Sequence, residues 1–253
     1  MSHHEPDYIP YHVAPRVGRG RALVFAPHPD DEVFGCTGAI LQHLADGDDV
    51  RLIVVTDGAF GVADDGGIYA ATRRAESRAA AKVLGYGEPL FWDYPDRGLV
   101  ADESLVCRVV EAIEAWGGLL VYAPSWWEIH PDHTALSAAG TEAVRRADSL
   151  TQLVLYEVAV PLHANVLLDI TSVIDKKRTA MACFASQLAQ QSYDQHVIAL
   201  NRYRSYTLPF DVRYVEAYRQ VDRTALEIRQ PLPLMMRVDS GAHPQEAVLD
   251  TAK

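Results

Sequence analysis

Two short segments of the sequence concentrate side chains that could hold a metal ion or move a proton. The first is PHPDDE at residues 27–32, directly after the apolar run ALVF, and the second is HPDH at residues 130–133, after LLVYAPSWWEI. Because Pro29 cannot donate to a strand ladder, it predicts a turn that presents the histidine and the aspartates at a strand end. A helix N-terminus there would use one aspartate as a cap, but it would not account for a histidine beside three consecutive acids.

The second segment opens a predicted helix. Proline is favoured in a first helical turn, and residues three apart project from the same side, so His130 and His133 converge. Either segment alone is more typical of a structural turn, but their pairing at the ends of two strands of one sheet favours a metal centre. Catalytic zinc typically takes three protein ligands, often a mixture of histidine and carboxylate, and keeps a fourth position open. His28, Asp31 and His133 would supply such a set.

Two further side chains would then stay beside the ion without binding it. Hydrolysis needs a base that deprotonates the attacking water and a donor that stabilises the developing oxyanion. Asp30 and a protonated His130 are the candidates for these two tasks. The pattern therefore predicts a metal-dependent hydrolase.

These segments need a fold that brings strand ends together. Between residues 20 and 160, apolar runs of strand length alternate with segments of helical period, which is typical of βαβ units and a parallel sheet. The predicted strands are 22–27, 50–58, 88–95, 118–125 and 152–160, and the predicted helices are 34–47, 72–85, 103–116, 132–147 and two more within 173–207. In open α/β sheets, ligands bind beyond the carboxyl ends of the strands, where both histidine segments fall. We therefore predict a Rossmann-like α/β fold with a mostly parallel sheet flanked by helices.

Length and composition limit the domain organisation. At 253 residues and 49% apolar content, the chain is near the upper size for one hydrophobic core. Residues 1–20 and 230–253 lack a sustained period, so we predict them to be tails. A single domain at 21–229 remains between them.

Charge and cysteine content narrow the partners and the location. A net charge of −11 argues against nucleic acid, and an acidic surface disfavours a lipid-anchored substrate at an anionic bilayer. Three separated cysteines favour a reducing compartment, and no apolar run approaches the roughly 20 residues that span a membrane. We expect a cytoplasmic protein with a small-molecule partner and neither nucleic acid nor membrane. In the predicted C-terminal tail, Met235 and Met236 would either pack locally or contact a neighbouring subunit, so the sequence is compatible with a homo-oligomer.

The segment APHPDDEVFGCTGAI, together with the downstream HPDH, resembles the LmbE-like family of PIG-L type deacetylases. The resemblance continues through TDG, RRAESRAAAKVLG, YPDRGL, KKRTAMACFASQ and YVEAYR, and it covers about residues 20–218. It implies a single-domain LmbE-like fold and the hydrolysis of an N-acetyl group from an N-acetylglucosamine-type soluble glycoside.

The resemblance also implies roles for individual residues. Zn²⁺, with Fe²⁺ as an alternative in the cell, would be bound by His28, Asp31 and His133. Asp30 would be the general base, and His130 would stabilise the tetrahedral intermediate or donate a proton. The remaining residue of the second motif, Asp132, would orient and charge-stabilise a histidine.

Five further residues are weaker candidates for substrate binding. Four charged side chains resemble positions at the substrate end of the family's pockets: Arg73, Arg74, Asp96 and Arg97. As isolated charges they are equally well explained by surface ion pairs. Trp127 lies beside Trp126 just before the second motif, and one of the two could stack on a sugar ring while the other is core.

Several alternatives share the same metal ligands. One is an amidase that acts on a thiol conjugate or on another N-acyl substrate. Another is a non-catalytic, metal-stabilised sugar-binding protein, which predicts a closed metal shell. A third is a non-haem iron oxygenase, whose facial triad also uses two histidines and a carboxylate. That third hypothesis leaves Asp30 and His130 without a task.

Overall fold

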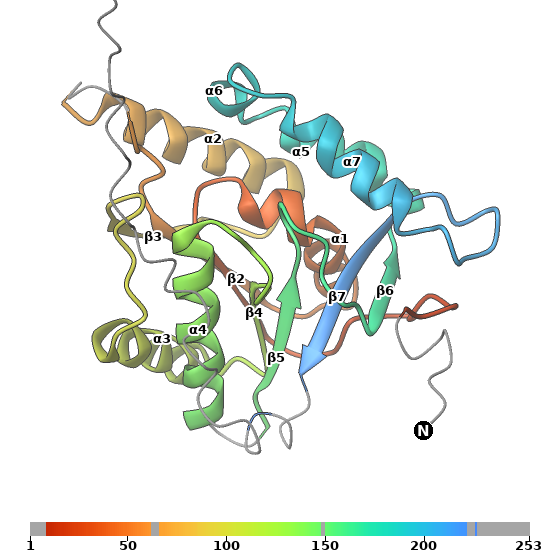
Figure 1. Cartoon of the computed structure of the whole chain (residues 1–253), viewed down its shortest axis with the longest axis horizontal. Helices are drawn as coiled ribbons and strands as arrows, with labels where there is room; N and C mark the ends of the chain where they lie inside the picture. The colour runs from red at the N-terminus through yellow and green to blue at the C-terminus, as the bar shows by residue number, and fades with distance from the viewer. Residues whose placement is uncertain (1–8, 62–65, 148–149, 222–225, 227–253) are drawn as a thin grey trace, which may run out of the picture.

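The computed structural model describes residues 9–61, 66–147, 150–221 and 226. Its centre is a seven-stranded sheet in the order β3-β2-β1-β4-β5-β7-β6 (Figure 1). The strands are β1 (Ala22–Ala26), β2 (Val50–Thr56), β3 (Leu90–Tyr94), β4 (Leu120–Pro124), β5 (Gln152–Tyr156), β6 (Val166–Asp169) and β7 (Val215–Val221). Strands β1 to β5 run parallel, whereas β7 is antiparallel to both β5 and β6. The prediction of a mostly parallel α/β sheet is confirmed.

Helices cover both faces of this sheet (Figure 1). On one face α1 (Asp31–Ala45) packs on β1 and β2, and both α1 and α2 (Ile68–Leu84) contact α5 (Ile174–Met181). On the other face α3 (Glu103–Trp116) and α4 (Pro131–Arg146) pack together, and α4 lies on β4 and β5. Because both faces are covered, the central strands β1 (ALVFA) and β4 (LVYAP) are buried along their whole length and carry no charged side chain.

The pleat of the strands divides the apolar side chains between two cores. Successive residues of a strand point to opposite faces, so Val24 joins the core that includes Ile40 of α1, whereas Phe25 joins the core that includes Leu136 of α4. Helix α3 begins where local chemistry predicts, because the Asp102 side chain accepts a hydrogen bond from the Leu105 N–H at its start.

The region after β5 departs from the prediction. The prediction of two helices within 173–207 is wrong. The structure instead has a short 3₁₀ turn followed by three helices, α5, α6 (Ala185–Leu188) and α7 (Tyr193–Tyr203). The helical pattern breaks at Phe184, whose backbone has φ −91° and ψ 55°. This break buries the Phe184 ring completely, with its centroid 6.0 Å from that of Phe34. Burial of one aromatic ring thus outweighs the continuation of a helix.

Part of the predicted N-terminal tail is packed against the domain. Residues 9–20 contain no helix or strand, yet Val17 is only 2% exposed and its N–H donates to Oε1 of Gln42. The Ala14 N–H donates to the carbonyl of Leu167 in β6. The packed region therefore begins before residue 21, and the predicted tail at 230–253 lies outside the described residues.

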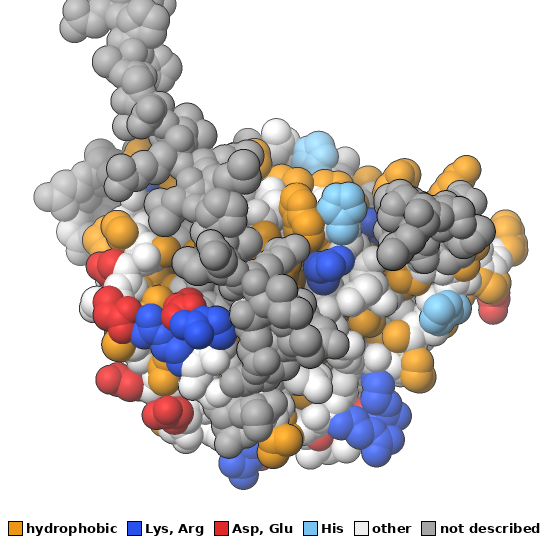
Figure 2. Space-filling model, turned by 60° about the horizontal axis from the view of Figure 1, so that its bottom comes forward, with side chains coloured by type: hydrophobic (Ala, Val, Ile, Leu, Met, Phe, Trp, Pro, Cys, Tyr) orange, Lys and Arg blue, Asp and Glu red, His pale blue; other side chains and the backbone are white. Residues whose placement is uncertain are grey.

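The surface mixes charges of both signs. Figure 2 shows acidic and basic side chains next to one another on the face turned forward. Elsewhere on the surface, Arg146 of α4 pairs with Glu103 of α3 in an exposed ion pair. Within the part of the chain that the structure describes, no helix combines the length and the apolar character needed to cross a membrane.

Candidate metal centre

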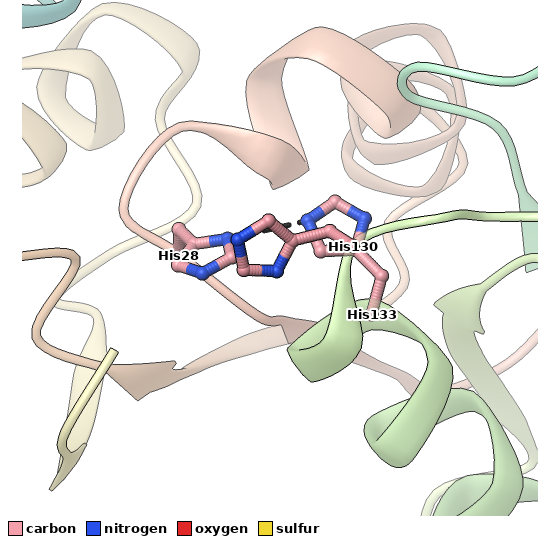
Figure 3. Close-up of side chains that lie close together, drawn as sticks. All are labelled: His28, His130 and His133. Carbon is pink, nitrogen blue, oxygen red and sulfur yellow. Dashed lines mark hydrogen bonds between the residues drawn. The ribbon is translucent and has the colours of Figure 1, made fainter. Parts of the chain in front are cut away.

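The two histidine segments meet at one edge of the sheet. Strands β1 and β4 are neighbours although β2 and β3 lie between them in the sequence, so the strand order reverses at this point. Ligand sites of open α/β sheets form beyond the carboxyl ends of the strands at such a switch point. His28 follows β1, whereas His130 and His133 lie at the start of α4, after β4. Figure 3 shows the three rings close together, and their centroids are 4.6 to 5.3 Å apart.

Three side-chain atoms form a nearly equilateral triangle. Nδ1 of His28 lies 3.2 Å from Oδ2 of Asp31 and 3.2 Å from Nε2 of His133, and the latter two atoms are 3.1 Å apart. Tetrahedral zinc with ligand bonds of roughly 2.0–2.1 Å holds its ligand atoms about 3.3 Å from each other. The triangle thus matches one face of a tetrahedral coordination shell. The cluster fits a divalent metal ion.

The charges around the triangle also favour a cation. Oxygens of Asp31, Asp96 and Asp132 lie 3.2 to 3.3 Å from the ring nitrogens of His28. Although burial acts in the opposite direction, these carboxylates raise the pKa of His28 well above its ordinary value. Burial likewise opposes the effect of Asp31 on His133, whose pKa is raised to about 9. A divalent cation compensates the same excess of negative charge that otherwise draws protons onto these histidines.

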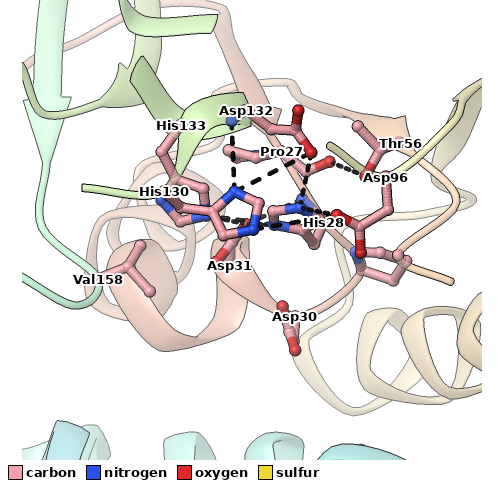
Figure 4. A network of polar contacts seen from close by, with 12 residues as sticks. Pro27, His28, Asp30, Asp31, Thr56, Asp96, His130, Asp132, His133 and Val158 are labelled. Atoms are coloured by element: carbon pink, nitrogen blue, oxygen red, sulfur yellow. Dashed lines mark hydrogen bonds and ion pairs between the residues drawn. The ribbon is translucent and has the colours of Figure 1, made fainter. Parts of the chain in front are cut away.

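Both histidines of the triangle have a carboxylate at their other ring nitrogen. Oδ2 of Asp132 lies 3.2 Å from Nε2 of His28, and Oε2 of Glu128 lies 3.4 Å from Nδ1 of His133 (Figure 4 for Asp132). The Asp132 carboxylate is held in turn by the main-chain N–H of Arg97, at 2.6 Å. Metal-binding histidines commonly donate their second N–H to such a carboxylate, which fixes the tautomer and the ring orientation.

Asp30 stands beside this network. In Figure 4 no dashed line joins its carboxylate to the histidines; its Oδ2 instead accepts a hydrogen bond from Nη2 of Arg73, at 3.0 Å. Arg73 is 4% exposed and also donates to the carbonyls of Pro29 and Gly58. The backbone of Asp30 has φ 145°, a conformation that non-glycine residues adopt only when their surroundings hold them there. Burial raises the pKa of Asp30 to about 7, although the Arg73 charge acts against this rise.

His130 is the most open of the three histidines, with 28% of its side chain exposed. Its Nδ1 accepts a hydrogen bond from the main-chain N–H of Asp132, so the neutral ring carries its proton on Nε2. Burial, followed by the charges of His28 and His133, lowers the pKa of His130. The neutral ring is therefore favoured over the protonated one expected from the sequence, and it still offers one N–H donor.

Comparison with known proteins bears directly on this centre. Residues 23–144 match the protein family described as PIG-L: GlcNAc-PI de-N-acetylase. This segment of the chain is therefore similar to PIG-L family proteins. The diacetylchitobiose deacetylase of Thermococcus kodakarensis is 28% identical over 193 residues, which is 69% of this chain and 72% of that protein. The matched PIG-L region runs from β1 to α4, so it contains both histidine segments and Asp30.

Solved structures share the fold of this chain. The N,N'-diacetylchitobiose deacetylase of Pyrococcus horikoshii, complexed with its inhibitor MPG, superposes with a TM-score of 0.74 over 85% of this chain and 87% of that chain, at 24% identity. The 4-carboxy-2-hydroxymuconate hydratase of Pseudomonas putida gives 0.67 over 80% and 96%, also at 24% identity. At this identity the likeness shows the fold alone. Because one of the two is named as a hydratase, the fold by itself does not specify deacetylation.

Of the five predicted substrate-binding residues, Asp96 lies within the candidate metal centre. Its Oδ1 is 3.3 Å from Nε2 of His28 and 3.9 Å from Nε2 of His130. Burial raises the pKa of Asp96, but the contact with His28 outweighs it and lowers the value to about 2. The side chain of the next residue, Arg97, is exposed and lies over the ring of Phe60, 4.5 Å from its centroid.

The other three predicted substrate-binding residues are placed differently. Arg73 contacts Asp30, as described above. Its neighbour Arg74 pairs with the half-exposed carboxylate of Asp93, at 2.7 Å. Trp127 packs against a small apolar cluster, with its ring centroid 5.1 Å from that of His163. The structure therefore brings Asp96 into the centre, Arg73 onto Asp30, and neither Arg74 nor Trp127 onto the triangle.

Two buried carboxylates beside the candidate centre were not predicted from the sequence. Glu128 accepts hydrogen bonds at its Oε1 from the main-chain N–H groups of residues 158–160, at 2.8 to 3.3 Å, and so joins the loop after β5 to His133. Its only signal in the sequence is a lone acid within WWEI. Glu32 accepts hydrogen bonds from the Tyr86 hydroxyl and from the main-chain N–H of Asp30. Glu128 thus supports His133, and Glu32 supports Asp30.

Proposed function

We propose that this chain is a zinc-dependent N-deacetylase that hydrolyses the acetamide of a soluble N-acetylglucosamine-type glycoside. The observation that carries the proposal is the triangle of His28, Asp31 and His133 with edges of 3.1 to 3.2 Å, next to the buried carboxylate of Asp30. Three protein ligands leave one tetrahedral position for water, as catalytic zinc sites do. The match to a family described as a de-N-acetylase supports the reaction class.

The metal ligands would be His28, Asp31 and His133, with Asp132 and Glu128 orienting the two imidazoles. When bound, Zn²⁺ supplies Lewis acidity, which lowers the pKa of water and polarises a carbonyl oxygen. The compatible chemistry of the donor set supports Zn²⁺, and Fe²⁺ is the alternative ion for the same nitrogen and oxygen ligands.

Asp30 would accept the proton of the attacking water. A general base must be held within hydrogen-bond reach of the proton that it takes, and the contact of Arg73 with Asp30 at 3.0 Å restrains the carboxylate. Arg73 leaves the second oxygen of Asp30 for the water. Arg73 is thus a positioning residue in this proposal, and a direct contact with the sugar is not needed.

His130 would donate a hydrogen bond from Nε2 to the oxyanion of the tetrahedral intermediate. The hydrogen bond from the Asp132 N–H to Nδ1 supports this tautomer, and a preorganised donor of this kind is worth about 3 kcal/mol in the transition state. The departing amine would take its proton from Asp30, which carries the proton received from the attacking water, because the neutral His130 ring keeps its Nε2 proton. Asp96, 3.9 Å from Nε2 of His130, would hold that ring or contact a substrate hydroxyl.

The substrate class rests on the relatives rather than on the shape of the site. A relative named as a diacetylchitobiose deacetylase matches 69% of this chain, which supports an N-acetylated amino sugar. The same chemistry would cleave the amide of a thiol conjugate or another N-acyl compound. We also propose a cytoplasmic location, which three unpaired cysteines support.

The test is the metal content of the purified protein together with amine release from a panel of N-acetylglucosaminides, with and without a chelator. We expect near one equivalent of zinc and amine release that the chelator abolishes. Bound metal with turnover of other amides only would favour the amidase. Bound metal without turnover of any amide would favour the sugar-binding protein and contradict the proposal.

A further inference from the structure

A buried ion pair lies behind the metal centre, in a part of the molecule that the proposed mechanism does not use. Lys177 of α5 and Glu216 of β7 are 0% and 2% exposed, and Nζ lies 2.7 Å from Oε1. Taking two charges out of water costs free energy that their mutual attraction often does not recover. Stability alone is therefore a weak reason for such a pair, and its other contacts indicate what else it does.

Both members of the pair contact the main chain of α1. Nζ of Lys177 donates to the carbonyl of Phe34 at 2.7 Å, and Oε2 of Glu216 accepts from the N–H of Gly38 at 2.7 Å. In an α-helix the N–H of residue i bonds to the carbonyl of residue i−4, so Phe34 and Gly38 supply the two groups of one helical hydrogen bond. The ion pair engages this carbonyl and this N–H together. The hydroxyl of Tyr218 also donates to Oε2, which holds the carboxylate from a third side.

The close approach of Glu216 to α1 depends on glycine at position 38. A Cβ atom on Gly38 would lie 2.6 Å from Oε2 of Glu216 and 2.3 Å from Cγ2 of Ile170. Both distances are far below van der Waals contact, so a side chain at this position would displace the carboxylate. Gly38, Glu216 and Lys177 are therefore parts of one arrangement.

The contacts fall about one turn (Phe34) and two turns (Gly38) after Asp31 of the candidate metal centre. Helix α1 begins at Asp31, and its N-cap is Asp30, whose side chain makes no capping hydrogen bond and whose φ is 145°. The N-cap side chain thus contributes no hydrogen bond to the first turn, although Arg73 and Glu32 hold Asp30 itself. A metal ligand must be placed within about 0.2 Å of its ideal distance, so the direction of the first turn matters for binding.

We propose that Lys177 and Glu216 are positioning residues that hold the first turn of α1, and with it Asp31 and Asp30, against His28 and His133. The inference rests on the proposed function, because it assigns the pair a task only if the triangle binds a metal. The pair acts through the main chain of α1 and touches neither metal nor substrate. Removing it lets the first turn shift, which weakens zinc binding and misplaces the base.

The test measures zinc affinity of the metal-free full-length protein by competition with a chromophoric chelator, together with the thermal midpoint. We expect Glu216→Gln and Lys177→Met each to weaken zinc binding at least about tenfold, as loss of a supporting residue typically does. At saturating zinc, kcat falls while KM stays within about twofold, because Asp30 moves with the same turn. The control, Ile174→Val, trims a buried side chain of α5 and leaves both charges in place.

The outcomes separate this inference from the proposed function. Variants that lose thermal stability but keep wild-type zinc affinity would show that the pair is only structural, and the inference would be wrong. If a single variant fails to fold because one buried charge is left unpaired, the double variant Lys177→Met/Glu216→Gln removes both charges and decides the question by the same readout. Failure of the wild-type chain to bind zinc would overturn the proposed function, and the inference with it.

Discussion

Buried charges are balanced differently in two regions of the molecule, the parallel half of the sheet, β1 to β5, and the segment after it, residues 157–221. After β5, buried charges are matched in pairs, Lys177 with Glu216 and Arg204 with Glu157. At the carboxyl ends of β1 and β4, carboxylates outnumber the buried cation Arg73, and two histidines lie among them. Buried charges need compensation, so the segment after β5 is balanced as it stands, whereas the carboxyl ends of β1 and β4 need a cation.

This difference indicates which region of the molecule binds a charged ligand. A matched pair contributes to the arrangement of the main chain, whereas an unmatched excess of one sign attracts a partner from solution. Four predictions test this difference in charge balance, in order of decreasing expected effect.

Removal of one vertex of the triangle should abolish the centre. His133→Ala leaves two ligands, so we expect the zinc content to fall from near one equivalent to near zero and amine release to be lost. Metal analysis after gel filtration measures this. The control is Ser137→Ala, which changes a buried polar side chain one turn further along α4. Full zinc content in His133→Ala would refute the ligand set.

Removal of the base should separate catalysis from metal binding. Asp30→Asn keeps the shape of the side chain but cannot accept a proton, so we expect kcat to fall about 10²- to 10⁴-fold with zinc content unchanged. Steady-state kinetics on the best N-acetylglucosaminide, together with metal analysis, measures this. Activity close to wild type would remove Asp30 from the mechanism.

Substitutions of Arg73 and Arg74 should differ in their effect on activity, although the sequence predicts the same substrate-binding role for both. Arg73→Gln removes the contact with Asp30, and the loss of a hydrogen bond to a charged group should lower kcat about 10- to 100-fold with little change in KM. Arg74→Gln is the matched control, because it removes an ion pair with the half-exposed Asp93 and should leave kcat within about twofold. An equal increase of KM in both variants would instead favour direct substrate binding.

The smallest effect is expected where the two regions meet. Glu128→Gln keeps an acceptor oxygen for the N–H groups of residues 158–160 but loses the charge beside Nδ1 of His133. We expect zinc affinity to fall by about tenfold, the lower end for a residue that supports a metal ligand. Chelator competition measures the affinity. An unchanged affinity would mean that His133 needs no carboxylate behind it.

The fold of the parallel half was predictable because its signals are local. The predicted strands and helices up to residue 160 correspond to β1 to β5 and α1 to α4, since apolar runs and helical periods can be recognised within a short window. The region after β5 was harder, because Phe184 interrupts a helical pattern to reach a ring on α1. No window around Phe184 contains that partner.

The amino-acid sequence alone predicts the residue types of the metal centre and the alternation of strands and helices in the parallel half. It also predicts the end of the sheet at which the two histidine segments lie. Three contacts become visible in the tertiary structure and not in the sequence. Arg73 holds Asp30, 43 residues away, and Glu128 lies next to Nδ1 of His133. Lys177 and Glu216, 39 residues apart, form an ion pair against α1. The physical reason is range. Spacing and periodicity are set by neighbouring residues, whereas the compensation of a buried charge depends on which distant segment the fold brings next to it.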